Sequence, residues 1–181
     1  MSTVRTPVLP AGAWKIDPAG SRVGFAVRHL GVATVKGTFT DVEGTVTVGE
    51  APGDMSASGS VAVASVDTGD AHRDEALRSA FFDDEAHPRI TFVSTAIEAR
   101  DGGLRVTGDF TMQGVTRELV LTTQVVPAGD GDGAPRLRLT ATGKLSRRDF
   151  SMRFKQAMGA GNKLVDDAVK LELEVSAVPQ G

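Results

Sequence analysis

Hydrophobic and polar residues alternate with a period of two along most of this chain, as is typical of half-buried β-strands. In residues 21–30, Val23, Phe25 and Val27 fall on one face of the expected strand, and Arg22 and Arg28 fall on the other. Comparable strand-like segments cover residues 35–39, 42–48, 58–66, 89–97, 104–112, 117–126, 136–145 and 168–178. The pattern predicts eight or nine strands in one domain, with no internal repeat.

Glycines inside these segments favour a closed barrel over a sandwich, which is the other arrangement open to many antiparallel strands. Strand glycines often mark the bends where a barrel coils. An eight-stranded barrel is just wide enough to be filled by side chains or to enclose one small ligand. The recurring strand glycines are Gly24, Gly37, Gly44, Gly108 and Gly143.

Only residues 71–82, AHRDEALRSAFF, predict a helix, and Asp70 is suited to be its N-cap. A helix this short is not stable by itself in water, so we expect it to dock on the sheet. The expected fold is therefore all-β, an eight-stranded antiparallel barrel with one short helix near its mouth.

Composition narrows the functional classes. The chain has 181 residues, a formal net charge of −3 and no cysteine, which excludes disulfides and thiol chemistry. The net charge gives no sign of binding to nucleic acid or to an anionic membrane. No segment approaches the roughly 20 apolar residues of a membrane span, and no signal peptide is evident at the N-terminus, so we expect a cytoplasmic protein.

Catalytic and metal motifs are not found. The three histidines, His29, His72 and His87, do not have the spacing of a metal site, and no G-x-S-x-G motif is present. We therefore expect no catalytic residues, no metal and no cofactor.

The inward face is apolar, and the pattern alone favours an ordinary filled core over an open cavity. Basic residues near the expected strand ends are open to two interpretations, a solvated rim or a cationic collar for an anionic head group. The candidate collar consists of Arg28, His29, Arg147 and Arg148. The candidate lining is Phe25, Val27, Phe39, Phe92, Leu104, Val106, Phe110, Met112, Leu139 and Leu145.

Four blocks resemble, in order and spacing, the YceI-like family of bacterial polyisoprenoid-binding proteins. They are WKIDPAGSRVGFAVRHLGVATVKGTF, SVDTGDAHRDEALRSAFFDDEAHPRITF, VTGDFTMQGVTREL and GKLSRRDF. The resemblance spans residues 14–178, which leaves residues 1–13 as a tail. One departure is that the family typically has a His-Ser pair where this chain has Gly20-Ser21, so a role of that histidine is absent here.

The resemblance implies a lipocalin-like barrel with a cavity for a long isoprenoid or quinone-like lipid, and a homodimer. It implies that Phe81, Phe82 and Phe150 join the lining, and that the helix lies over one mouth with Asp70, Asp74 and Glu75 facing water. That helix either gates the mouth or merely caps the barrel. Two other functions stay open: an enzyme acting on such a lipid, with His29 or Asp149 as the acid-base group, and a packed-core stress-response scaffold without ligand.

Overall fold

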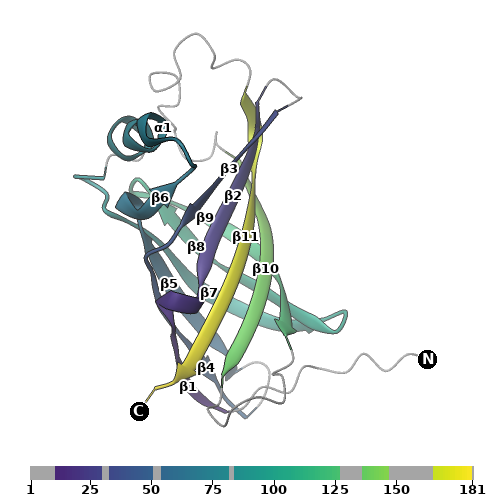
Figure 1. Cartoon of the computed structure of the whole chain (residues 1–181). Coiled ribbons are helices and arrows are strands. Elements are labelled where there is room, and N and C mark those ends of the chain that lie inside the picture. The colour runs from purple at the N-terminus through teal and green to yellow at the C-terminus, as the bar shows by residue number, and fades with distance from the viewer. Residues whose placement is uncertain are drawn as a thin grey trace.

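The computed structural model describes residues 11–29, 33–50, 54–81, 84–126, 136–146 and 165–180, without the side chains at 29, 33, 80–81 and 165–167. Eleven strands are present in these ranges (Figure 1). They are β1 (Gly12–Ile16), β2 (Arg22–His29), β3 (Ala33–Phe39), β4 (Val42–Val48), β5 (Ser56–Ala62), β6 (Val66–Asp67), β7 (Arg89–Arg100), β8 (Gly103–Met112), β9 (Val115–Val126), β10 (Leu137–Ser146) and β11 (Val165–Pro179).

Within the described residues, eight strands close an antiparallel ring in the order β1-β4-β5-β7-β8-β9-β10-β11, and β11 pairs back to β1. The remaining three strands extend members of this ring. β2 continues in the direction of β1 along β11, β3 leads into β4 and pairs with β2, and β6 follows β5 and pairs with β3. The predicted eight-stranded antiparallel barrel with one short helix is therefore confirmed.

Local sequence explains where the strands break and turn. Pro18 begins a one-turn 3₁₀ helix, Pro18–Gly20, which separates β1 from β2. Two hairpins turn through pairs of residues with positive φ, Asp101-Gly102 between β7 and β8 and Gln113-Gly114 between β8 and β9. Positive φ at both central positions is the geometry that matches the right-handed twist of paired strands.

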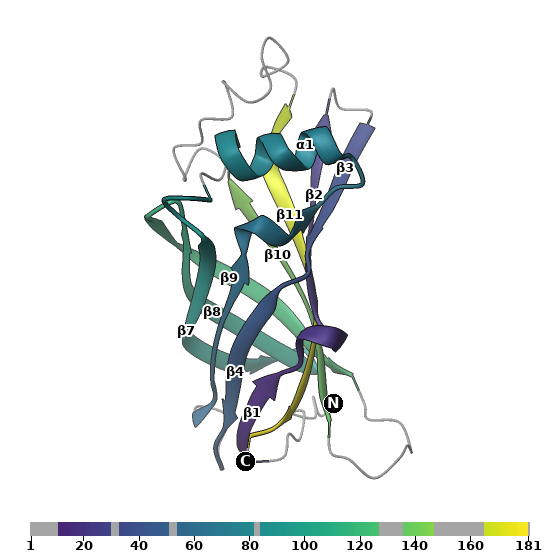
Figure 2. The ribbon, with the colours of Figure 1, turned by 60° about the vertical axis from the view of Figure 1, so that its left-hand side comes forward.

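The single α-helix of the described residues, α1 (Ala71–Ala76), continues as one π-helical turn, Leu77–Phe81. Figure 2 shows α1 lying across the end of the barrel at which β2 ends and β3 begins. Leu77 packs against the apolar cluster at this end, which includes Val63, Val66 and Met112. Docking on the barrel supplies the stability that so short a helix lacks alone. No helix among the described residues has the length and apolar character needed to cross a membrane.

Candidate functional site

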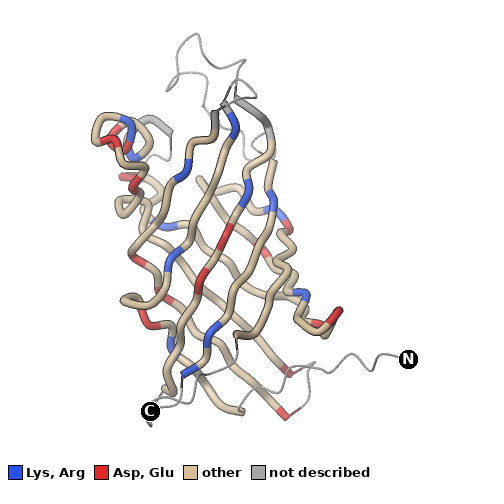
Figure 3. The backbone as a smooth tube through the Cα atoms, turned by 45° about the vertical axis from the view of Figure 1, so that its right-hand side comes forward, with Lys and Arg blue, Asp and Glu red and all other residues tan. Residues whose placement is uncertain are grey.

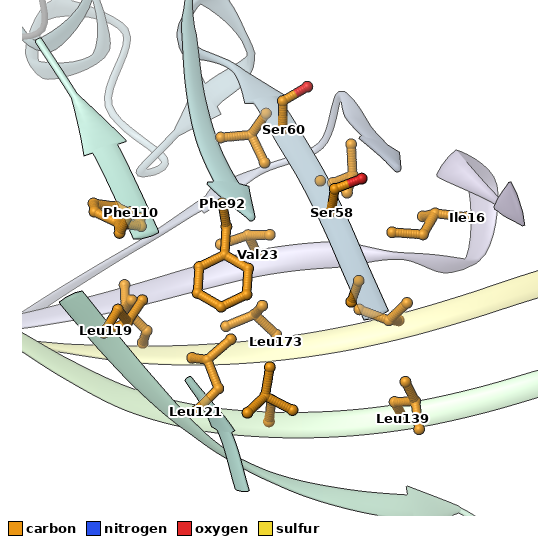
Figure 4. A pocket seen from close by; sticks show the side chains of 18 of the residues that line it. Ile16, Val23, Ser58, Ser60, Phe92, Phe110, Leu119, Leu121, Leu139 and Leu173 are labelled. Atoms are coloured by element: carbon orange, nitrogen blue, oxygen red, sulfur yellow. The ribbon is translucent and has the colours of Figure 1, made fainter. Parts of the chain in front are cut away.

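An apolar cavity of about 170 Å³ lies inside the barrel (Figure 4). Its walls come from almost every strand of the ring, and alternation along each strand aims the lining side chains inward. Figure 4 shows Phe92, Phe110, Leu121 and Leu173 converging on one space. The lining residues are Ile16, Val23, Phe39, Val42, Val46, Ala57, Ser58, Gly59, Ser60, Val61, Ile90, Phe92, Val106, Phe110, Leu119, Leu121, Thr123, Leu139, Ala141, Leu171, Leu173 and Val175.

Polar side chains add almost nothing to this wall. The Ser58 and Ser60 hydroxyls point away from the space in Figure 4, and Ser60 Oγ accepts a hydrogen bond from Arg89 Nε at 2.8 Å. Thr123 is buried, and its Oγ1 donates to the Leu121 carbonyl at 3.4 Å. Among the lining residues the structure describes, none is ionisable. The cavity therefore suits a ligand portion with no polar group, since a buried polar atom without a partner is costly.

Phe39, Phe92 and Phe110 line this cavity, together with Val106 and Leu139, as the sequence pattern anticipates. The other described candidates lie in packed clusters next to it. Phe25 and Phe39 have ring centroids 5.6 Å apart in a tilted arrangement. The apolar cluster that contains this pair also includes Val27, Met112 and Leu145. Leu104 belongs to a second cluster, together with Val106.

The opposite end of the barrel is packed around Trp14, which is 4% exposed. Val48 and Leu137 pack with it, and Ala177 is fully buried beside them. The barrel interior thus combines both arrangements that the sequence left open. Its ends are filled with side chains, and its middle holds a cavity.

Many lining residues are aliphatic side chains that lie within the expected strand segments but are not among the candidate lining residues. Val42 and Val46 of β4, and Leu171, Leu173 and Val175 of β11, are of this kind. Their period-two spacing was the available signal, because inward positions repeat every second residue. The wall contributed by β5 is less visible in sequence, since Ala57 and Gly59 are small and carry little hydrophobic signal.

A hydrogen-bonded cluster fastens α1 to the segment after β6. Asp74 is buried and accepts hydrogen bonds from the Thr68 backbone N–H at 2.8 Å and from the Thr68 hydroxyl at 2.5 Å. Arg73 donates from Nε to Thr68 Oγ1 at 2.8 Å and from Nη2 to the Thr68 carbonyl at 2.9 Å. The expectation that Asp74 faces water is therefore wrong, because its carboxylate satisfies the backbone that leads into the helix.

The predicted N-cap is confirmed. Asp70 Oδ1 accepts a hydrogen bond from the Arg73 backbone N–H at 3.1 Å. This bond is the main cause that lowers the pKa of Asp70 below its ordinary value. Desolvation opposes it, and the charge of Arg73 and a backbone hydrogen bond from His72 add smaller lowering effects. Asp70 and Glu75 are exposed, as expected.

The Gly20-Ser21 pair, which departs from the family pattern, has a structural role. Ser21 Oγ accepts from the Ser176 backbone N–H at 2.9 Å and donates to the Ser176 carbonyl at 3.2 Å, which fixes the chain to β11 where β1 and β2 separate. Arg136 donates to Ser176 Oγ at 2.6 Å and to Asp17 Oδ2 at 2.9 Å. The hydrogen bond from Arg136 is the main cause of a lowered pKa at Asp17.

The candidate head-group residues are only partly described. Arg28 is exposed on β2. His29 ends the same strand, but its side chain, like that of Phe81, is outside the description. Phe82, Arg147, Arg148, Asp149 and Phe150 lie outside the described residues. A cationic collar and a phenylalanine gate at the mouth therefore stay predictions.

Comparison with known proteins gives a consistent result. Residues 14–177 match the YceI-like domain. Protein YceI of Escherichia coli O17:K52:H18 is 35% identical over 167 residues, which cover 90% of this chain and 86% of that protein.

Solved structures share the fold. The crystal structure of BcnA from Burkholderia cenocepacia superimposes with a TM-score of 0.77 at 24% identity, over 90% of this chain and 99% of the other. A polyisoprenoid binding domain from Saccharophagus degradans, implicated in plant cell wall breakdown, gives a TM-score of 0.66 at 14% identity, over 92% and 98% of the two chains.

Proposed function

The chain belongs to the YceI-like family, and from this membership we propose that it is a non-catalytic binding protein that holds an isoprenoid or quinone-like lipid chain inside its barrel. The observation that carries the proposal is the apolar cavity wall, whose described lining has no ionisable residue and in which Ser60 Oγ and Thr123 Oγ1 already form hydrogen bonds. The polyisoprenoid binding of the Saccharophagus degradans domain supports the choice of ligand class.

Burial of hydrocarbon supplies the affinity. Each CH₂ group removed from water contributes about 0.8 kcal/mol, so a five-carbon isoprene unit contributes up to about 4 kcal/mol. The loss of translational and conformational freedom on binding offsets part of this gain. A cavity without polar partners discriminates poorly between apolar chains of similar width, so we expect selection by apolar length rather than by double-bond pattern.

Cavity size sets how much of the chain fits. An apolar cavity of about 150 Å³ accommodates benzene, and the cavity here is of similar size, about 170 Å³. The described cavity therefore takes about one or two isoprene units. A longer chain has to continue past the packed ends, which requires side chains there to move.

A direct test is native mass spectrometry of freshly purified protein, followed by solvent extraction and identification of whatever is released. We expect a discrete apolar adduct of isoprenoid mass. In parallel, purified apo protein is titrated with isoprenoid alcohols of one, two and four isoprene units. Affinity should rise from one unit to two, and a further rise at four units would show that side chains at the packed ends move to admit the longer chain.

Two results would contradict the proposal. The first is a clean apo mass combined with no uptake of any added isoprenoid, which would favour a scaffold with a packed core. The second is chemical turnover of the added lipid, which would favour the enzyme alternative. Two further points stay predictions: that the protein forms a homodimer, and that Arg147 and Arg148 bind a charged head group of the ligand.

A further inference from the structure

The outer face of the sheet formed by β10, β11, β2 and β3 carries a compact group of cations. Strand register places Lys144 directly opposite Lys170, Lys170 opposite Ala26, and Ala26 opposite Lys36. Toward the α1 end, Ser146 lies opposite Ala168 and Arg28 lies opposite Thr34. The register between β11 and β2 is irregular there, between Val165 and Val169, and this part of β11 contains Asp166 and Asp167. We call Lys36, Lys144 and Lys170 the lysine face.

Acidic residues of the same strands lie further along the barrel. The following two outward rows contain Glu172 and Glu174, and Glu174 pairs with Arg22 at 3.0 Å. Basic residues are present there too, since Arg22 lies in the row of Glu174 and Arg138 lies in the next outward row. Figure 3 shows acidic residues in the middle of this face, with basic residues above and below them. The lysine face is therefore a local group of cations on a chain whose net charge is −3.

The arrangement of the lysines is unfavourable for the isolated protein. Directly opposed residues on neighbouring strands have Cβ atoms about 5 Å apart, and like charges at that spacing destabilise a sheet. Lys36 lies two strands from Lys170, at about 10 Å, which is slightly more than the Debye length of about 8 Å at physiological salt, so its repulsion with Lys170 is weaker. All three lysines are exposed, and none forms an ion pair with another described residue. An anionic surface opposite them would relieve this repulsion.

We propose that the lysine face docks the protein on the surface of an anionic lipid bilayer. The face is a broad sheet surface across four adjacent strands, three of which contribute its lysines, and such a surface suits a flat partner better than a small anion. Each Lys or Arg near an anionic membrane contributes about 1 kcal/mol, so three lysines give reversible binding. Docking of this kind would bring the barrel to the layer in which an isoprenoid lipid resides.

A nucleic acid is the other polyanion to consider, and the face fits it less well. Surfaces that bind single strands combine cations with aromatic side chains on which the bases stack. The described outward positions around the lysines contain no aromatic residue; they are Gly24, Ala26, Arg28, Thr34, Thr38, Thr142, Ser146, Ala168 and Glu172.

The test is co-sedimentation of the full chain with vesicles of phosphatidylglycerol and phosphatidylcholine, and with vesicles of phosphatidylcholine alone. We expect binding only to the anionic vesicles, weakening as salt is added. The triple variant Lys36→Gln/Lys144→Gln/Lys170→Gln should lower the partition coefficient by about 100-fold. A control variant, Lys15→Gln/Arg100→Gln/Arg105→Gln, has the same net charge but its changes lie elsewhere on the barrel, so its binding should stay within a few-fold of wild type.

The outcomes separate docking from lipid binding inside the barrel. Because removal of opposed like charges does not weaken the sheet, the triple variant should melt no lower than wild type and should still take up an apolar naphthylamine dye. If both variants lost vesicle binding equally, net charge alone would explain the binding, and the proposal of a specific lysine face would be wrong. Absence of vesicle binding by the wild type would overturn the proposal, whether or not the protein binds an oligonucleotide. Failure of dye uptake in the wild type would count against the cavity function only.

Discussion

The aromatic ring of Phe25 lies against the backbone of Gly37, its register partner across the β2–β3 pair. A Cβ atom on Gly37 would lie 2.7 Å from Phe25 Cε1, closer still to Cζ, and 2.9 Å from Thr68 Cγ2. Thr68 in turn holds Asp74 of α1. One close approach thus connects the packed end of the barrel interior with the helix that lies over it.

Gly37→Ala should lower the free energy of unfolding by about 1–3 kcal/mol, because the added methyl group overpacks this end of the core. Chemical denaturation measures the change. A double-mutant cycle with Phe25→Leu isolates the contact, since the smaller side chain leaves room for the methyl group. If the two substitutions proved additive, the ring would not be the cause of the strain.

Phe92→Asp should abolish uptake of isoprenoid alcohols, because the substitution puts an unpaired carboxylate into a cavity with no polar partner. The neighbouring residue supplies the matched control. Val93 points outward and is 53% exposed, so Val93→Asp should bind as wild type does. Uptake is measured by titration with geranylgeraniol, and circular dichroism verifies that each variant is folded. Equal losses in both variants would show that the cavity is not the binding site.

Ala141→Phe tests the cavity without introducing a charge, in case Phe92→Asp fails to fold. Ala141 is 8% exposed and lines the cavity from β10, so a phenyl group there occupies the space of the ligand. We expect affinity for geranylgeraniol to fall by about tenfold or more, equivalent to at least about 1.4 kcal/mol of lost apolar burial. Stability should be unchanged or raised by about 0.5–2 kcal/mol, as for other cavity-filling changes. Unchanged affinity would place the ligand elsewhere, and Thr142→Phe on the outer face is the control.

The strands of the barrel could be predicted because alternation between residues close together in the chain identifies the two faces of each strand. The boundary between packed and open interior could not be predicted in this way. Phe25 and Phe92 have the same inward pattern, and each ring lies over a glycine of a neighbouring strand, Gly37 and Gly108 respectively, yet only Phe92 lines the cavity. Such contacts depend on register between segments that local periodicity does not reveal.

The burial of Asp74 shows a second limit of the sequence. A charged residue in a short helix with acidic neighbours ordinarily faces water. Its position here is set by the backbone N–H of Thr68, the first residue after β6, which donates a hydrogen bond to the Asp74 carboxylate. The lysine face has the same origin, since Lys36, Lys144 and Lys170 are far apart in sequence and meet through strand pairing.

Asp74→Ala should detach α1 from the barrel end and cost about 1.5–3 kcal/mol, the range for hydrogen bonds to a charged acceptor. The loss leaves the Thr68 N–H and hydroxyl without their acceptor. Denaturant titration gives the cost, and amide exchange within α1 shows whether the helix opens selectively. Glu75→Ala, at the adjacent exposed position, is the control and should change stability little. If the amides of α1 exchanged at the same rate in Asp74→Ala and in Glu75→Ala, Asp74 would not be the residue that anchors the helix.

Acid should weaken the start of α1 through Asp70. The folded-state pKa of this carboxyl is lowered, chiefly by the hydrogen bond from the Arg73 N–H, so its ionised form favours the folded state. The contribution is complete above the unfolded pKa of about 3.9 and is lost as pH falls through the lower folded-state pKa. Amide exchange of α1, measured relative to the β-strands, should therefore accelerate in that acid range. Asp70→Asn keeps a capping acceptor without a charge, so its relative exchange should not depend on pH there. If the variant and the wild type responded to acid alike, another group would control the helix terminus.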